Sequence, residues 1–149
     1  MKIAQMIDTL SLGGTQRMLI HLVRNLQPLG MEITVINLRP PADESISAEL
    51  ESMGVRLVSF SFLKLFSPSS FYRLLKFLYR EQFDLLQAYL AYSNIVASFA
   101  GRLVGVPVIG SLRNTGHDPL GYSLKQDLLN RIALRYACTR VLANGFAVA

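Results

Sequence analysis

Two adjacent glycines, Gly13 and Gly14, stand between a short apolar run and an amphipathic stretch. Because they lack Cβ atoms, a ligand or another backbone can come close to them. The helix expected after them turns its first N–H groups and its positive dipole end toward the same point, which suits a phosphate. The pair has neither the G-x-G-x-x-G spacing of a dinucleotide fold nor the lysine of a P-loop. A glycine-rich turn that lets strand and helix pack would look the same, so both interpretations stay open.

The segment "GSLRNTGHD", residues 110–118, gathers a second set of chemical groups. The guanidinium of Arg113 suits a phosphate or carboxylate, Asn114 can bind sugar hydroxyls, and His117 can move a proton. We therefore take Arg113 and His117 as the candidate catalytic residues. The alternative is a solvated polar loop in which Arg113 pairs with Asp118.

Other reactive side chains do not form a catalytic or metal-binding set. No serine stands in a nucleophile elbow, and Cys138, the single cysteine, is expected to be a buried structural thiol beside the last strand. His21 falls on the polar face of its helix and is expected to be solvated. Two histidines and one cysteine, widely separated, make a zinc site improbable. We predict neither a metal nor a cofactor.

Alternating strand and helix patterns must position these groups. Six short apolar blocks predict strands at residues 2–7, 32–38, 55–60, 84–89, 107–112 and 140–144. Amphipathic patterns predict helices at 15–29, 69–82, 93–104 and 123–137. This alternation indicates an α/β fold, with a Rossmann-like, doubly wound, mostly parallel sheet in a three-layer α/β/α arrangement. Functional groups then belong at the carboxyl ends of the strands.

The composition fits one domain over residues 1–149. The chain is 51% apolar with a mean hydropathy of +0.33, and no apolar run is long enough to span a membrane. The first residues are too polar for a signal peptide, and a single cysteine allows no internal disulfide, so we expect a cytoplasmic protein. The net charge is +5, but no reading helix or stacking platform accompanies it, so no nucleic-acid partner is expected.

The helix predicted at 69–82 has a basic outer face. That face carries three cations edged by aromatic side chains: Arg73, Lys76 and Arg80, with Tyr72 and Tyr79 on one flank and Phe77 on the other. A basic face of this kind can lie on an anionic membrane surface, which would make a peripheral contact at the inner face of a membrane. The commoner explanation is a solvated helix face whose long basic stems cover the aromatic rings.

Four segments taken in order carry a resemblance. They are "KIAQMIDTLSLGGTQRML", "HLVRNLQPLGMEITVINL", "FDLLQAYLAYSNIVASFAGRLVGVPVIGSLRN" and "YACTRVLAN". Together they resemble the amino-terminal, acceptor-side domain of group 1 (family 4) glycosyltransferases with the GT-B fold. Those enzymes place two Rossmann-like domains across a cleft, and the resemblance covers only the first. It implies that the carboxyl-terminal, donor-binding domain is absent from this chain.

The resemblance also implies roles for particular residues. Gly13 and Gly14 match the glycine loop that approaches the donor diphosphate, and the helix start at 15–17 would steady the charge on the leaving nucleotide. Arg113 stands where many relatives place a histidine near the donor sugar. The implied substrate- and phosphate-binding residues are Gly13, Gly14, Thr15, Arg17, Tyr92, Ser93, Asn94 and Asn114.

The implied reaction transfers a sugar from a UDP- or GDP-type nucleotide-sugar to an acceptor hydroxyl, with retention at the anomeric carbon. It would serve polysaccharide, lipopolysaccharide or glycolipid synthesis, need no bound metal, and leave the isolated domain inactive. Two alternatives remain. One is another GT-B enzyme, such as a sugar-nucleotide epimerase, and the other is a non-catalytic binding domain at a membrane.

Overall fold

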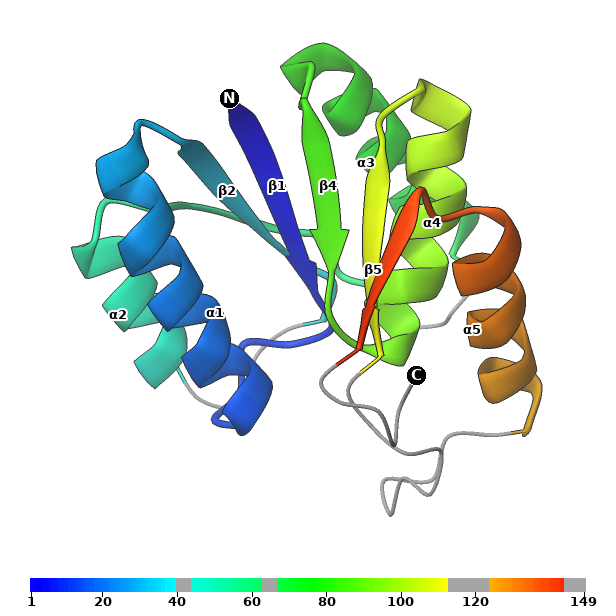
Figure 1. Ribbon diagram of the computed structural model, residues 1–149, viewed down its shortest axis with the longest axis horizontal. Helices are drawn as coiled ribbons and strands as arrows, with labels where there is room; N and C mark the ends of the chain where they lie inside the picture. The colour runs from blue at the N-terminus through cyan, green and yellow to red at the C-terminus, as the bar shows by residue number, and fades with distance from the viewer. Residues whose placement is uncertain (40–43, 63–66, 113–123, 144–149) are drawn as a thin grey trace.

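A computed structural model describes residues 1–39, 44–62, 67–112 and 124–143. It shows one six-stranded sheet in the order β3-β2-β1-β4-β5-β6, with every strand parallel to its neighbours (Figure 1). The strands are β1 (Lys2–Ile7), β2 (Glu32–Asn37), β3 (Arg56–Ser59), β4 (Leu85–Ala88), β5 (Val108–Leu112) and β6 (Arg140–Ala143). The helices are α1 (Gly14–Leu26), α2 (Ser45–Ser52), α3 (Pro68–Glu81), α4 (Ala91–Val104) and α5 (Leu124–Tyr136).

The helices form one layer on each face of the sheet. Helices α1 and α2 cover one face, and α3, α4 and α5 cover the other (Figure 1). Since side chains alternate along a strand, Met6 of β1 packs toward α3 and α4, whereas its neighbour Ile7 packs toward α1 and α2. The predicted three-layer, doubly wound fold is confirmed, and the sheet is parallel throughout.

All six predicted strands are present, each within two residues of its predicted ends. The helix predicted at 15–29 is shorter, because α1 ends at Leu26 and a 3₁₀ turn, Gln27–Leu29, follows it with Pro28 inside. Helix α2 was not predicted. The position of Phe77 on the outer flank of its helix was predicted wrongly, because the ring is buried between Phe60 and Phe83. In the described ranges no helix is long and apolar enough to cross a membrane.

Helix α4 is almost completely enclosed. It packs against α3, α5, β4 and β5, and nine of its fourteen residues are buried. Gly101 allows this approach, because a Cβ there would collide with the side chain of Val108 and the carbonyl oxygen of Val106. Gly110 does the same on β5, where a Cβ would collide with Leu134 of α5. Small residues therefore bring this layer close to the sheet.

Glu81, at the end of α3, ties three elements together at the amino edge of the sheet. Its carboxylate lies 2.8 Å from Arg56 of β3, 2.9 Å from Lys2 of β1 and 3.2 Å from Arg80. The hydrogen bonds from Arg56 and Lys2 lower the pKa of Glu81 from its usual 4.5 to about 2. Ion pairs therefore join the amino ends of β1 and β3 to the end of α3.

Candidate functional site

Two helices begin at the carboxyl ends of the central strands. Strand order reverses between β1 and β4, which are neighbours in the sheet although β2 and β3 lie between them in sequence. Helix α1 starts just beyond β1 and α4 just beyond β4, so both amino termini lie at this switch point (Figure 1). In open parallel sheets, ligands bind at such a place.

The glycine loop at this edge gives its two glycines different surroundings. A Cβ on Gly13 would stand 2.6 Å from Oε1 of Gln16, whose Nε2 donates to the carbonyl of Thr9 at 2.9 Å. A Cβ on Gly14 would meet nothing within 4 Å. A side chain at Gly13 would therefore displace the end of the Gln16 side chain, whereas the space beside Gly14 is open to a ligand.

The first turn of α1 has an electrostatic environment that favours an anion. It contains no acidic side chain, and its N-cap residue, Gly13, has no side chain to cap the helix. Thr15 is half-buried and Arg17 is exposed. Free N–H groups at a helix start, together with a nearby guanidinium, suit a phosphate group.

Asp8 lies directly after β1, and its carboxylate is buried. Oδ1 accepts a hydrogen bond of 2.6 Å from the backbone N–H of Ser93, at the start of α4. Burial raises the pKa of Asp8, while the hydrogen bonds from Ser93 and the charge of Arg39 oppose that shift. Asp8 therefore joins β1 to α4 across the switch point.

Arg39 brings a positive charge to the same edge. Its backbone N–H donates to the carbonyl of Asp8 at 2.9 Å, and its guanidinium carbon lies 4.4 Å from the centre of the Tyr92 ring. The residue is exposed, whereas Tyr92 is buried and its pKa is raised by that burial. Sequence reasoning did not name Asp8 or Arg39 as site residues, although each directly follows a predicted strand, at the edge where functional groups were expected.

The predicted trio Tyr92, Ser93 and Asn94 lies at the start of α4, at the expected edge, but all three side chains are buried. The Asn94 amide makes two hydrogen bonds to the backbone of Ser111, donating at 2.9 Å and accepting at 3.1 Å. This pair fastens α4 to the end of β5. Substrate contact by the trio stays a prediction.

Two buried polar side chains at this edge have no hydrogen-bond partner in the described part of the chain. One is Asn37, at the end of β2, whose amide nitrogen and oxygen are both unpaired. The other is Ser111, near the end of β5, whose hydroxyl is unpaired. The two residues are 1% and 2% exposed. Unpaired buried groups are rare, and water or a ligand can complete their bonding.

The remaining predicted site residues have different outcomes. Arg113, Asn114 and His117 lie outside the described residues, so their catalytic and binding roles stay predictions. His21 is exposed, as predicted. Cys138 is half-buried rather than fully buried, its sulfur lies 2.9 Å from the hydroxyl of Ser98, and burial raises the pKa of the thiol; its structural role stays a prediction. Among the residues that the structure covers, no cluster of three metal-ligating side chains is present.

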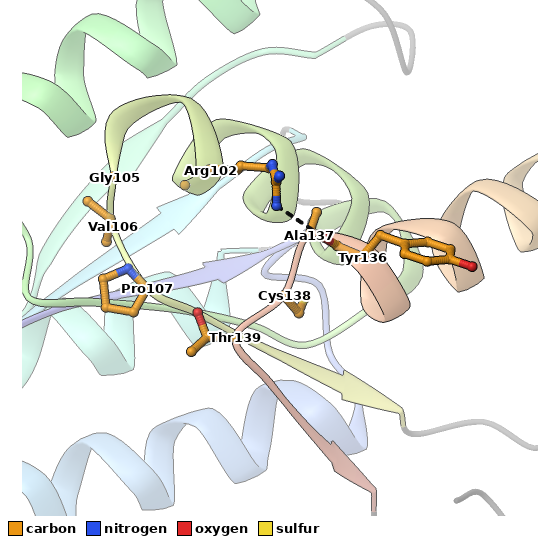
Figure 2. A pocket seen from close by; sticks show the side chains of 9 residues that line it. Arg102, Gly105, Val106, Pro107, Tyr136, Ala137, Cys138 and Thr139 are labelled. Carbon is orange, nitrogen blue, oxygen red and sulfur yellow. Dashed lines mark hydrogen bonds between the residues drawn. The ribbon is translucent and has the colours of Figure 1, made fainter.

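A hollow of about 320 Å³ lies at the opposite, amino edge of the sheet, between the ends of α4 and α5 (Figure 2). Arg102 reaches across it and donates to the carbonyl of Tyr136 at 3.2 Å. Cys138 and Thr139 also line it, and the Thr139 hydroxyl accepts the N–H of Val108. Each of these polar groups already has a partner within the protein, so the hollow offers no reactive set.

The family model for Glycosyltransferase Family 4 matches residues 12–149. No curated protein sequence is a significant match. Among solved structures, HepE of Anabaena in complex with UDP is similar, with a TM-score of 0.80 at 18% identity, over 99% of this chain and 39% of that one. HepE in complex with UDP-glucose gives a TM-score of 0.78.

Two further structures share the fold at lower similarity. MurG of Acinetobacter baumannii has a TM-score of 0.66 and 12% identity, over 95% of this chain and 40% of that one. UDP-GlcNAc 2-epimerase from Neisseria meningitidis, bound to UDP-GlcNAc, has a TM-score of 0.68 and 13% identity, over 96% and 40%. The chain thus spans about two fifths of the length of the proteins that it resembles.

Proposed function

The chain belongs to glycosyltransferase family 4, and we propose that it is the acceptor-side domain of an enzyme that transfers a sugar from a nucleotide-sugar to a hydroxyl group. The observation that carries this proposal is the open space at Gly14. A glycine without a packing reason, at a helix start on the functional edge, is what a closely approaching ligand requires.

In this proposal the glycine loop contacts the diphosphate of the donor. The N–H groups and dipole of α1 stabilise the negative charge that grows on the nucleotide diphosphate as the bond to the sugar breaks. Arg17 and Arg39 add positive charge at the same edge, since both side chains are exposed there. Catalysis then depends on positioning and on electrostatic stabilisation.

We further propose a UDP-type donor, retention at the anomeric carbon, and a role in polysaccharide, lipopolysaccharide or glycolipid synthesis in the cytoplasm. The UDP and UDP-glucose complexes of HepE support the nucleotide. Arg113 and His117 are the proposed catalytic residues, and Asn114 the proposed sugar-binding one. No metal or cofactor is required in this mechanism.

The proposal assigns most donor contacts to a second domain. Support comes from the coverage, because similar proteins extend well beyond the matched part. The 149-residue chain alone is therefore expected to bind nucleotide weakly and to transfer no sugar.

A second candidate is epimerisation of a sugar nucleotide, favoured by the epimerase of Neisseria meningitidis that has the same fold and binds UDP-GlcNAc. Both candidates place a nucleotide diphosphate at the same edge, and the family match favours transfer.

Calorimetric titration of the chain with UDP, GDP, UDP-glucose and UDP-GlcNAc tests the proposal. Binding of UDP that is weakened by Gly14→Val supports it. Absence of binding by every nucleotide contradicts a diphosphate contact in this domain. To separate the two candidates, the full-length protein is incubated with UDP-GlcNAc, because an epimerase changes the sugar without an acceptor.

A further inference from the structure

The positive charge of the protein is concentrated in one helical layer. Helices α3, α4 and α5 carry seven basic and two acidic residues, a formal excess of +5 that equals the net charge of the whole chain. Helices α1 and α2 together carry two arginines and two glutamates. The two outer layers of the molecule therefore differ sharply in charge.

Exposed apolar side chains are concentrated in the same layer. The described residues include twelve large apolar side chains that are exposed, and seven of them belong to α3, α4 and α5, whereas none belongs to α1 or α2. The seven are Tyr72, Tyr79, Phe99, Leu103, Leu128, Ile132 and Tyr136. Tyr72, Tyr79 and Leu103 keep about two thirds of their surface exposed, at 68%, 70% and 67%.

These side chains point away from the sheet. On α3, Leu74 and Leu78 are buried against the core, and Tyr72 and Tyr79 fall on the opposite side of the helix. On α5, Ala133 and Leu134 are buried, whereas Leu128 faces outward. Because α4 packs against both α3 and α5, the outward sides of the three helices share one side of the molecule (Figure 1).

We call this surface the basic–aromatic face, made of the seven apolar residues above and of Arg73, Lys76, Arg80, Arg102, Lys125, Arg131 and Arg135. Arg80 shares the carboxylate of Glu81, and Arg131 pairs with Asp127 at 3.0 Å. Arg73, Lys76 and Lys125 are exposed, and no ion pair to them occurs in the described part of the chain. Their charge is available to a partner.

We propose that the basic–aromatic face binds the surface of an anionic lipid bilayer. Uncompensated lysine and arginine attract anionic headgroups, tyrosine rings settle at the boundary between headgroup and hydrocarbon, and leucine, isoleucine and phenylalanine enter it. A nucleic acid would bind the positive charges but would make no favourable contact with the exposed leucine and isoleucine side chains. The proposal is independent of sugar transfer, because it concerns a face away from the carboxyl edge and requires no nucleotide.

The test measures binding of the 149-residue chain to vesicles of phosphatidylcholine, with and without phosphatidylglycerol, in the absence of nucleotide. The charge variant is Arg73→Gln with Lys76→Gln, and its matched control is Arg24→Gln with Arg140→Gln, which removes the same charge outside this face. One basic residue changes partition about fivefold, so the charge variant is expected to lose tenfold or more and the control about twofold or less.

A second variant, Tyr72→Ser with Tyr79→Ser, tests the aromatic part. Raising the salt concentration screens the charges, so the binding that remains at high salt is expected to fall in this variant. All substituted side chains are exposed, and circular dichroism checks that each variant is folded. The proposal is overturned if the parent ignores anionic vesicles, if it binds neutral vesicles as well, or if the charge variant and its control lose binding equally.

Discussion

Replacing Gly14 by alanine separates a ligand contact from a packing role. The added Cβ meets no atom within 4 Å, and Gly14 is not among the residues with positive φ, so the folded protein accepts it without strain. At such a site, alanine stabilises by about 0.4–1 kcal/mol, mainly because the unfolded chain loses conformational freedom. For a domain of this size, that raises the melting temperature by about 1–4 °C.

Binding of a nucleotide is expected to change in the opposite direction. If a diphosphate lies against the backbone of Gly14, the new methyl group occupies its place. An added methyl in a close contact costs about 1–3 kcal/mol, and each 1.4 kcal/mol is a factor of about ten in affinity. UDP affinity should therefore fall about fivefold to 150-fold in a protein that melts at a higher temperature.

Thermal unfolding without ligand and calorimetric titration with UDP measure the two effects separately. Gly105→Ala is the matched control: Gly105 lies at the opposite edge with a φ of +77°, so alanine there should destabilise by about 1 kcal/mol and leave UDP affinity unchanged. An unchanged UDP affinity in the Gly14→Ala variant would refute the reasoning, because the open space would then have no ligand.

Three further changes test the surroundings of the site and the opposite edge. Glu81→Gln should lower the free energy of unfolding at neutral pH, and this difference from the parent should vanish as pH falls from 4.5 to about 2. The reason is that the lowered pKa makes the contribution of Glu81 present above 4.5 and absent below 2. Urea unfolding at several pH values measures the difference, and a difference that stays constant with pH would contradict this prediction. Asn94→Ala should cost about 2–4 kcal/mol in the same assay, since the N–H and carbonyl of Ser111 lose their buried partner; a loss under about 1 kcal/mol would show that water replaces the amide. Gln16→Ala releases the carbonyl of Thr9 and should lower UDP affinity severalfold with about 1 kcal/mol or less of lost stability, while equal UDP affinity would show that the loop keeps its shape alone.

The sheet was predictable because each strand is a local pattern. The block at residues 2–7 contains the apolar residues Ile3, Ala4, Met6 and Ile7 and forms β1 over the same residues. Helix α2 escaped prediction because, over eight residues, only Ile46 and Leu50 are buried, which gives too short a pattern to recognise. Phe77 was misplaced because its burial depends on Phe60 and Phe83, which other segments supply.

The candidate site also has one part that could be predicted from the sequence and another part that could not. The glycine pair could be predicted because a strand, two glycines and a helix are adjacent in sequence. The hydrogen bond between Asp8 and Ser93 could not, because it joins residues 85 positions apart and depends on the strand order that makes β1 and β4 neighbours. The same is true of Arg39, which reaches Tyr92 only after both strands are in place.

The enclosure of α4 limits how this protein can diverge. Nine of its residues are buried, and Gly101 leaves no room for even one added carbon, so almost any drift in this helix must be matched by simultaneous changes in its neighbours. The outward sides of α3 and α5 carry no such packing restriction, because their side chains are exposed. Substitutions are therefore expected to be tolerated more readily on the surface than at the centre, and HepE of Anabaena has a similar backbone, with a TM-score of 0.80, at only 18% identity.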